Sequence, residues 1–290
     1  MSSVGNEFTY KGRPFNGYTT TLLLDEVCKF QFLPTDIVVS TFPRSGTTFT
    51  QEIVWQIKNR KTVKLDEEVE NTILRFPFIE FNTEKNPLLS KSFIEVLNSQ
   101  KESQYRLIKT HVPYEFIKEN FEKVNPKMII VMRNAKDCLV SNYYLNRSFP
   151  DLEKKTNFDD YFDKFYSEET SSGSYFDNNL EWWALRDQKN ILILFYEDIL
   201  NNQRENVNKI ANFICENLTE DEVQKIVHNS SFSTMYNNPK VNLSFGDSKF
   251  IRKGIIGDSK NYLSDEQNRL INEKIQFKFC GTDLETRLKI

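Results

Sequence analysis

One short stretch of the chain combines hydroxyl groups, a cation and a glycine in an order that could bind an anion. Thr41-Phe-Pro-Arg-Ser-Gly-Thr-Thr48 follows a β-branched run, and apolar residues at helical spacing come after it. A strand, a tight loop and a helix in this order aim backbone N–H groups and the positive end of the helix dipole at one point. Further donors come from Arg44, Ser45, Thr47 and Thr48. The stretch predicts a cradle for a phosphate or a sulfate.

This loop differs from the P-loop of nucleoside-triphosphate enzymes in two places. The P-loop reads Gly-x4-Gly-Lys-Ser/Thr, whereas Thr41 stands here at the first glycine position and Thr47 stands after Gly46 in place of the lysine. The cation is Arg44, at the front of the loop. The sequence therefore favours an anion that arrives without magnesium, and we expect no metal site. A generic strand-to-helix turn is the alternative for the loop taken alone.

A second predicted strand ends in residues that could carry out acid-base chemistry. The run 105–111 places Lys109 and His111 just before Pro113, and in parallel α/β folds ligands bind beyond the carboxyl ends of the strands. A neutral imidazole can take a proton from a hydroxyl group as its oxygen attacks. His111 is therefore a candidate base, with a hydrogen-bonded structural histidine as the alternative.

A third predicted strand, 127–132, delivers Arg133 at its carboxyl end. Ser141 follows one turn into the next predicted helix. A forked guanidinium donor and a hydroxyl group could together hold a second phosphate. A surface cluster of charged residues is the alternative.

Two less regular stretches complete the set of candidate site residues. Three phenylalanines surround a proline in 75–81, and Phe78 and Phe81 could line an apolar cavity, although aromatic clusters are more often plain core. The tail 241–260 has few periodic apolar positions but carries two glycines and three cations near its end. Such a loop predicts an anion clamp or lid.

Composition predicts a globular protein, and the length is within range for one large α/β domain over residues 1–290. Hydrophobic residues make up 39% of the 290 and charged residues 27%, and the formal net charge of −3 argues against a general nucleic-acid or membrane-surface binder. No N-terminal basic-then-apolar segment and no run near the about 20 apolar residues of a membrane span is present. We therefore expect a cytoplasmic protein. The four scattered cysteines, Cys28, Cys138, Cys215 and Cys280, predict reduced and mostly buried thiols.

Apolar runs and helical patterns alternate along the chain. Strands are predicted at 36–41, 105–111, 127–132 and 190–198, and helices at 22–30, 51–58, 90–98, 158–166, 175–188, 204–218, 219–228 and 265–279. A further helix is predicted after Asp137, with Leu139, Val140 and Tyr143 on one side. This alternation is typical of a parallel, doubly wound sheet. The expected fold is a central parallel sheet flanked by helices, with a P-loop-like loop for the anion.

Four motifs in order resemble the cytosolic sulfotransferases, which transfer a sulfuryl group from 3'-phosphoadenosine-5'-phosphosulfate (PAPS) to a small acceptor. They lie at 41–48, 109–113, 133–141 and 252–258 and span nearly the whole predicted domain. The resemblance implies that PAPS is the co-substrate and that the product is 3'-phosphoadenosine-5'-phosphate (PAP). It also implies a role for each matched residue.

By this resemblance, the loop Arg44, Ser45, Gly46, Thr47 and Thr48 would hold the 5'-phosphosulfate, and Phe49 would stack on the adenine. The 3'-phosphate would be held by Arg133, Ser141, Arg252, Lys253 and Gly254, and the rest of the nucleotide would contact Tyr196, Ser230, Phe232, Phe250 and Ile251. His111 would act as the base, with Lys109 and Arg44 as the other catalytic residues. The acceptor would contact Phe78, Phe81, His111 and Leu145.

The chain departs from the family pattern at several positions. Arg44 stands where the family usually has lysine, and arginine keeps the charge but does not readily give up a proton. Phe49 and Ser259 replace tryptophans. The family's dimer signature is reduced to Lys260, Ser264, Asp265 and Arg269, which leaves monomer and homodimer open.

The acceptor is predicted to be a small apolar or aromatic molecule with a hydroxyl group, such as a phenol or a steroid alcohol, or an amine. Two other functions remain as alternatives at this level. A nucleotide kinase-like phosphotransferase would share a phosphate loop in an α/β domain. A non-catalytic PAPS- or PAP-binding protein would keep the anion clamps without turnover.

Overall fold

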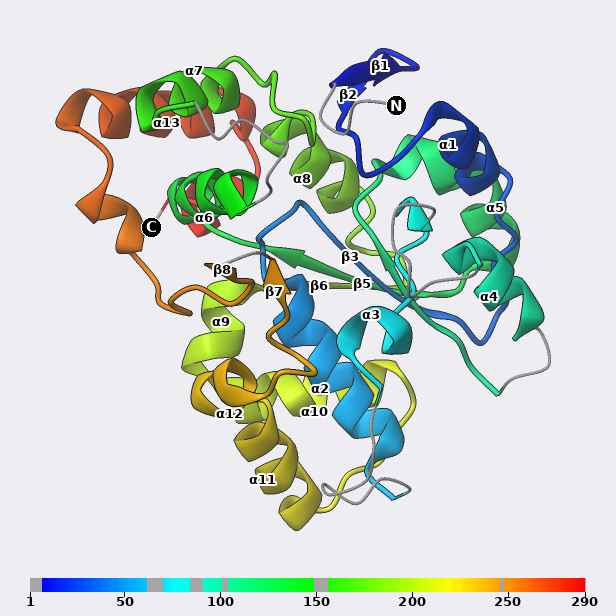
Figure 1. The fold of residues 1–290 in the computed structure, drawn as a ribbon. Coiled ribbons are helices and arrows are strands. Elements are labelled where there is room, and N and C mark those ends of the chain that lie inside the picture. Colours follow the sequence, from blue (N-terminus) through cyan, green and yellow to red (C-terminus); the bar gives the residue numbers. More distant parts are fainter. Residues whose placement is uncertain are drawn as a thin grey trace.

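The computed structural model describes residues 7–61, 70–83, 91–100, 104–148, 156–245 and 248–289. Its centre is a parallel sheet of four strands in the order β4-β3-β5-β6 (Figure 1). The strands are β3 (Ile37–Thr41), β4 (Leu107–Thr110), β5 (Lys127–Met132) and β6 (Ile191–Phe195). All four lie within the predicted strand ranges, so the predicted parallel sheet is confirmed.

Helices cover both faces of this sheet (Figure 1). Alternate residues along the strands belong to the two different core layers. One face packs, through Val38, Ile108 and Ile130, against α1 (Thr21–Cys28), α5 (Tyr114–Val124), α6 (Ala135–Ser148), α7 (Phe158–Tyr166), α8 (Tyr175–Trp183) and α13 (Asp265–Lys278). The other face packs, through Val39, Ile129 and Val131, against α2 (Thr47–Asn59), α10 (Gln203–Phe213) and α11 (Glu220–Asn229). Strands buried on both faces read as continuous apolar runs, which is why the sequence predicts them well.

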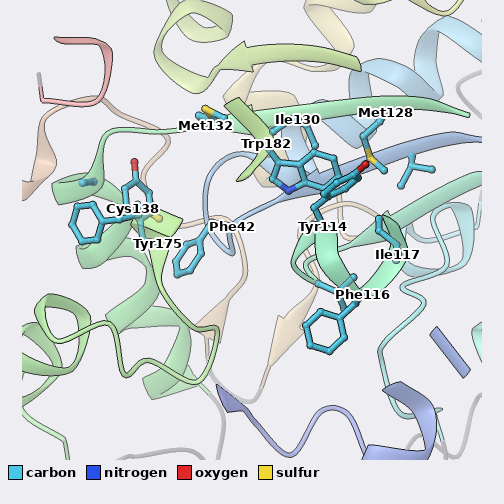
Figure 2. Close-up of a cluster of buried hydrophobic side chains, with 14 of the residues drawn as sticks. Phe42, Tyr114, Phe116, Ile117, Met128, Ile130, Met132, Cys138, Tyr175 and Trp182 are labelled. Carbon is cyan, nitrogen blue, oxygen red and sulfur yellow. The ribbon is translucent and has the colours of Figure 1, made fainter. Parts of the chain in front are cut away.

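An aromatic cluster fixes α5 and α8 against the first of these faces. Figure 2 shows Trp182 and Tyr114 beside Met128 and Ile130 of β5. The Trp182 and Tyr114 rings are 5.2 Å apart and meet edge to face, a favoured arrangement of aromatic pairs. Tyr114 comes three residues after His111, so this packing also holds the chain that leaves the end of β4.

Several shorter elements complete the fold. They are β1 (Phe8–Tyr10), β2 (Arg13–Phe15), α3 (Thr72–Arg75), α4 (Phe93–Ser99), α9 (Tyr196–Asn201), α12 (Phe232–Asn237), β7 (Ser244–Phe245), β8 (Ser248–Lys249), the 3-10 helix η2 (Asp258–Asn261) and α14 (Leu284–Arg287). The hairpins β1-β2 and β7-β8, and the helices α3, α5, α9, α12 and α14, were not among the predicted elements. Each is short except α5, whose polar composition hides an apolar stripe.

Several predicted boundaries were wrong for local reasons. The helix at 175–188 ends at Trp183, because the N–H groups from Leu185 onward bond three residues back instead of four. The helix at 204–218 ends at Phe213, where Cys215 takes a left-handed conformation with φ of 61°. The strand at 190–198 stops at Phe195 since α9 begins there. The start of the predicted helix 90–98 lies outside the described residues.

The prediction of mostly buried thiols is correct only in part. Cys138 is buried and Cys28 is half-buried, but Cys215 and Cys280 are exposed, and all four thiols are free. Among the described helices, none has the length and apolar character needed to cross a bilayer.

Candidate active site

The loop between β3 and α2 turns sharply through two residues with positive φ. These are Arg44 (φ 72°) and Gly46 (φ 111°), and Gly46 is the N-cap of α2. A Cβ atom at Gly46 would lie 2.7 Å from Cδ2 of Tyr196, so only glycine allows this approach. The helix begins at Thr47, earlier than predicted, and its first turn leaves N–H groups without an intrahelical partner. The expected arrangement of strand, loop and helix N-terminus is present.

One cavity of about 300 Å³ brings nearly all the predicted site residues together. Its lining includes Arg44, Gly46, Thr47, Thr48, Phe49, Phe78, Phe81, Lys109, His111, Arg133, Ser141, Leu145, Tyr196, Ser230, Phe232, Phe250, Ile251, Arg252, Lys253 and Gly254. Residues that are up to about 200 positions apart in the chain thus meet at the carboxyl end of the sheet, where α/β folds place their ligands.

Ser45 is the predicted site residue that the structure does not bring into this lining. Its hydroxyl group is fully buried 3.6 Å from the sulfur of Cys138 on α6, and its backbone N–H donates to the Phe42 carbonyl at 3.2 Å. The turn at Arg44 and Gly46 rotates this side chain into the core. The hydroxyl donor expected from the sequence at this position therefore points away from the cavity.

Three guanidinium groups gather at one end of the cavity. Arg44 Nε donates to Ser141 Oγ at 3.0 Å, and Arg133 donates to the Arg44 carbonyl at 3.1 Å. Burial, followed by the nearby charges of Arg133 and Arg252, lowers the pKa of Arg44 to about 10. The Nε atoms of Arg133 and Arg252 are buried and have no hydrogen-bond partner within the described residues. Like charges held together with unused donors favour an anion at this end of the cavity.

Two carboxylates hold the C-terminal loop over these cations. Asp137 at the start of α6 accepts hydrogen bonds from the N–H groups of Gly257 (2.6 Å) and Ser259 (2.9 Å). Asp258 pairs with Arg252 at 2.6 Å and with Lys253 at 2.8 Å. The loop predicted as an anion clamp is thus fixed by groups that the sequence did not single out.

His111 lies at the end of β4 in a defined tautomer. Its Nδ1–H donates to the Thr41 carbonyl at 2.8 Å, because a carbonyl oxygen can only accept. The lone pair is then on Nε2. Burial, with the nearby charge of Lys109, lowers the pKa of His111 well below 6.5, so the ring is neutral near pH 7. A neutral imidazole whose lone pair is on Nε2 can accept a proton there.

A buried carboxylate that sequence reasoning missed holds the end of β4. Glu80 accepts hydrogen bonds from the backbone N–H of His111 and from Thr110 Oγ1, the latter at 2.9 Å. Burial raises the pKa of Glu80 to about 7, although the two hydrogen bonds act to lower it. Burial lowers the pKa of Lys109 to about 8. Glu80 thereby fixes the backbone that carries Lys109 and His111.

The other end of the cavity is aromatic. Phe78 meets the His111 ring edge-on at 5.0 Å, and Lys109 Nζ lies 4.1 Å from the Phe78 ring centre. Phe81 is 5.9 Å from Phe78 and 6.4 Å from Phe93. Phe78 and Phe81 therefore lie at the cavity, as expected, rather than in the plain core. An apolar ring or chain would fit between these side chains, next to His111.

An α/β fold whose cavity has cations at one end and aromatic rings at the other suits an enzyme that transfers an anionic group. Comparison with known proteins gives the family. The sulfotransferase domain model matches residues 34–283. Sulfotransferase 1C2 of Rattus norvegicus is 36% identical over 269 residues, which cover 89% of this chain and 88% of that protein. Sulfotransferase 1B1 of Canis lupus familiaris is 34% identical over 282 residues, which cover 94% of this chain and 93% of that protein. The chain belongs to the sulfotransferase family and is an enzyme of the sulfotransferase type.

Solved structures agree with this assignment. Mouse sulfotransferase SULT7A1 complexed with PAP has a TM-score of 0.81 at 26% identity, covering 98% of this chain and 97% of that chain. A retinol dehydratase complexed with retinol and PAP also has a TM-score of 0.81, at 27% identity, covering 94% of this chain and 89% of that chain. The resemblance seen in the four sequence motifs is confirmed at the level of the family and the fold.

Proposed function

We propose that this chain transfers a sulfuryl group from PAPS to a hydroxyl group, or an amine, of a small apolar or aromatic acceptor. The observation that carries the proposal is that three arginines at one end, phenylalanines at the other end, and His111 all line one cavity. Structural relatives contain PAP, and one of them also contains retinol, an apolar alcohol. Membership of the sulfotransferase family leaves the kinase-like alternative without support.

The residues present fit a nucleotide with two anionic groups. Arg44 and the first turn of α2 would hold the 5'-phosphosulfate, and Ser141 would contact the 3'-phosphate. Arg133 and Arg252, whose Nε atoms are buried without a partner among the described residues, would hold the 3'-phosphate. Aromatic rings suited to stacking on a base line the same cavity at Phe49, Tyr196 and Phe232.

When bound, PAPS supplies the sulfuryl group and a phosphate oxygen as the leaving group. His111 would take the proton of the acceptor hydroxyl on Nε2, because Nδ1 is already bonded to Thr41. Arg44 and Lys109 would stabilise the negative charge that grows on the leaving oxygen. Transfers with loose transition states need chiefly alignment and such electrostatic support, which fixed donors can provide.

A magnesium-free assay with radiolabelled PAPS and a panel of phenols, steroid alcohols and amines tests this proposal. We expect labelled product from at least one class of acceptor and calorimetric binding of PAP to the same protein. Binding of PAP without transfer to any acceptor on the panel would contradict the proposed acceptor class. Absence of PAP binding would overturn the proposal as a whole.

Replacing Arg133 with alanine should weaken binding of PAP about thirtyfold but change binding of adenosine-5'-phosphosulfate much less. A charge-assisted hydrogen bond contributes about 2 kcal/mol, and only PAP carries the 3'-phosphate that Arg133 would hold. Calorimetric titration of both nucleotides checks this, with Arg204→Ala on the exposed side of α10 as the control. Equal losses for the two nucleotides would show that Arg133 does not bind the 3'-phosphate.

The specificity constant kcat/KM for PAPS should fall as the pH rises through about 8. Burial lowers the pKa of Lys109 to about 8, and a lysine carries its positive charge below its pKa and loses it above. A pH profile of kcat/KM for PAPS checks the prediction because this constant reports the free enzyme. The variant Lys109→Arg keeps the charge and should flatten the alkaline fall. An unchanged fall in that variant would mean that another group titrates.

A further inference from the structure

Two buried amide side chains in the cavity have no assigned partner. Asn142 on α6 and Gln51 on α2 are each only 2% exposed, and both line the cavity. Asn142 Nδ2 and Gln51 Nε2 have no hydrogen-bond partner among the residues that the structure describes. Buried amide groups are nearly always hydrogen-bonded, since an unmet donor is costly. These two donors are therefore candidates for contacts with a ligand.

Gln51 can be placed relative to His111 from contacts along α2. It follows Thr47 by four residues, so the two side chains lie on the same helix face. The Thr47 hydroxyl is 2.7 Å from that of Thr41, and the Thr41 carbonyl accepts the hydrogen bond from His111 Nδ1. Gln51 is thus on the side of α2 that faces His111, one turn beyond Thr47.

Asn142 lies between the two ends of the cavity on α6. It follows Ser141, whose hydroxyl accepts from Arg44, and it precedes Leu145 by about one turn. Leu145 also lines the cavity and is predicted to contact the acceptor. Asn142 is therefore next to the place where the arginine end of the cavity gives way to its apolar end.

The chemistry of these amides indicates what they would recognise. Both are neutral, so they suit an uncharged partner, and an –NH2 group donates to an oxygen. Two carboxylates that could attract a cationic acceptor line the cavity, Glu80 and Glu181. Glu80 already accepts hydrogen bonds from Thr110 and His111, and Glu181 pairs with Arg13 at 2.6 Å. The phenylalanines nearby offer only apolar contact. An uncharged oxygen on an otherwise apolar molecule matches this set of side chains.

We propose that the acceptor carries a second uncharged oxygen, a carbonyl or a hydroxyl, which accepts hydrogen bonds from Asn142 and Gln51. This inference rests on the proposed function and narrows it. The acceptor class changes from any apolar alcohol to an apolar alcohol that carries a second oxygen. The oxygen that receives the sulfuryl group faces His111, and the second oxygen faces the amides. The amides position the acceptor and take no proton.

Matched pairs of acceptors test the inference. One pair is para-butylphenol and its analogue with a carbonyl at the third chain carbon from the ring. Two CH2 groups separate this carbonyl from the ring, so the acidity of the phenol is almost the same in both compounds. A second pair is a steroid alcohol with a distal ketone and its counterpart without it. We expect wild-type kcat/KM to favour the ketone of at least one pair by about tenfold, the value of one net hydrogen bond. In Asn142→Leu and in Gln51→Leu this preference should shrink severalfold.

The controls separate lost recognition from lost folding. Asn208→Leu makes the same change on an exposed position of α10 and should keep the wild-type preference. PAP affinity and melting temperature should be the same in all variants. Equal kcat/KM for both members of each pair, or a preference that survives in both amide variants, overturns the inference while sulfuryl transfer stands. Absence of both product and PAP binding would instead overturn the proposed function, and the inference with it.

Discussion

Replacing His111 with alanine should slow sulfuryl transfer by two to four orders of magnitude, the range typical of losing a general base, and leave PAP affinity nearly unchanged. The contacts of His111 leave one ring nitrogen to act as the base. Its Nδ1–H is bonded to the Thr41 carbonyl at 2.8 Å and its backbone N–H to Glu80, so Nε2 is the ring atom left for the acceptor proton. Burial and Lys109 lower its pKa and keep the ring neutral.

The measurement is kcat with saturating radiolabelled PAPS and an accepted phenol or steroid alcohol, together with calorimetric titration of PAP. His228→Ala is a matched control because the chain has only two histidines and His228 lies exposed on α11. That variant should transfer at the wild-type rate. Activity of His111→Ala within a few-fold of wild type would contradict the role of base.

The sheet could be predicted from the sequence because its strands are buried on both faces. Val38 and Val39 face different layers, and both are fully buried, so the run shows no polar interruption. The helix α5 escaped prediction because its first turn follows Pro113 directly and charged residues separate its apolar positions. The short elements β7 and β8 carry too few residues for a periodic signal.

The candidate site was predictable where a residue's own type reveals its chemistry and was missed where partners set the role. Arg133 and His111 are visible as a cation and an imidazole after apolar strands. The role of Glu80 is not visible in the sequence. It depends on an isolated β-bridge between Phe78 and Lys109, which brings two distant stretches of the chain side by side. For Ser45 the prediction was wrong although the residue type suggested it. The sequence predicts a hydroxyl donor in the cavity, but the backbone turn directs this hydroxyl group into the core.

Replacing Arg44 with methionine should lower kcat by two to three orders of magnitude, the usual effect of removing one preorganised donor to a developing negative charge. Arg44 is held for such contact by Ser141 at 3.0 Å and by the Phe250 ring, which lies 4.6 Å from its guanidinium carbon. Its pKa of about 10 keeps it charged at neutral pH. The fold should tolerate the change, because the charges with the largest effect on the pKa of Arg44 are the like charges of Arg133 and Arg252.

The variant Arg44→Lys shows which property of this residue matters. If charge alone stabilises the leaving oxygen, Arg44→Lys should recover most of the activity lost in Arg44→Met, with Arg204→Met as a surface control. If proton donation also contributes, lysine should exceed wild type, since lysine gives up a proton more readily than arginine. Single-turnover rates with bound PAPS measure the difference. Wild-type rates in Arg44→Met would mean that Lys109 and the N–H groups of α2 suffice to stabilise the leaving oxygen.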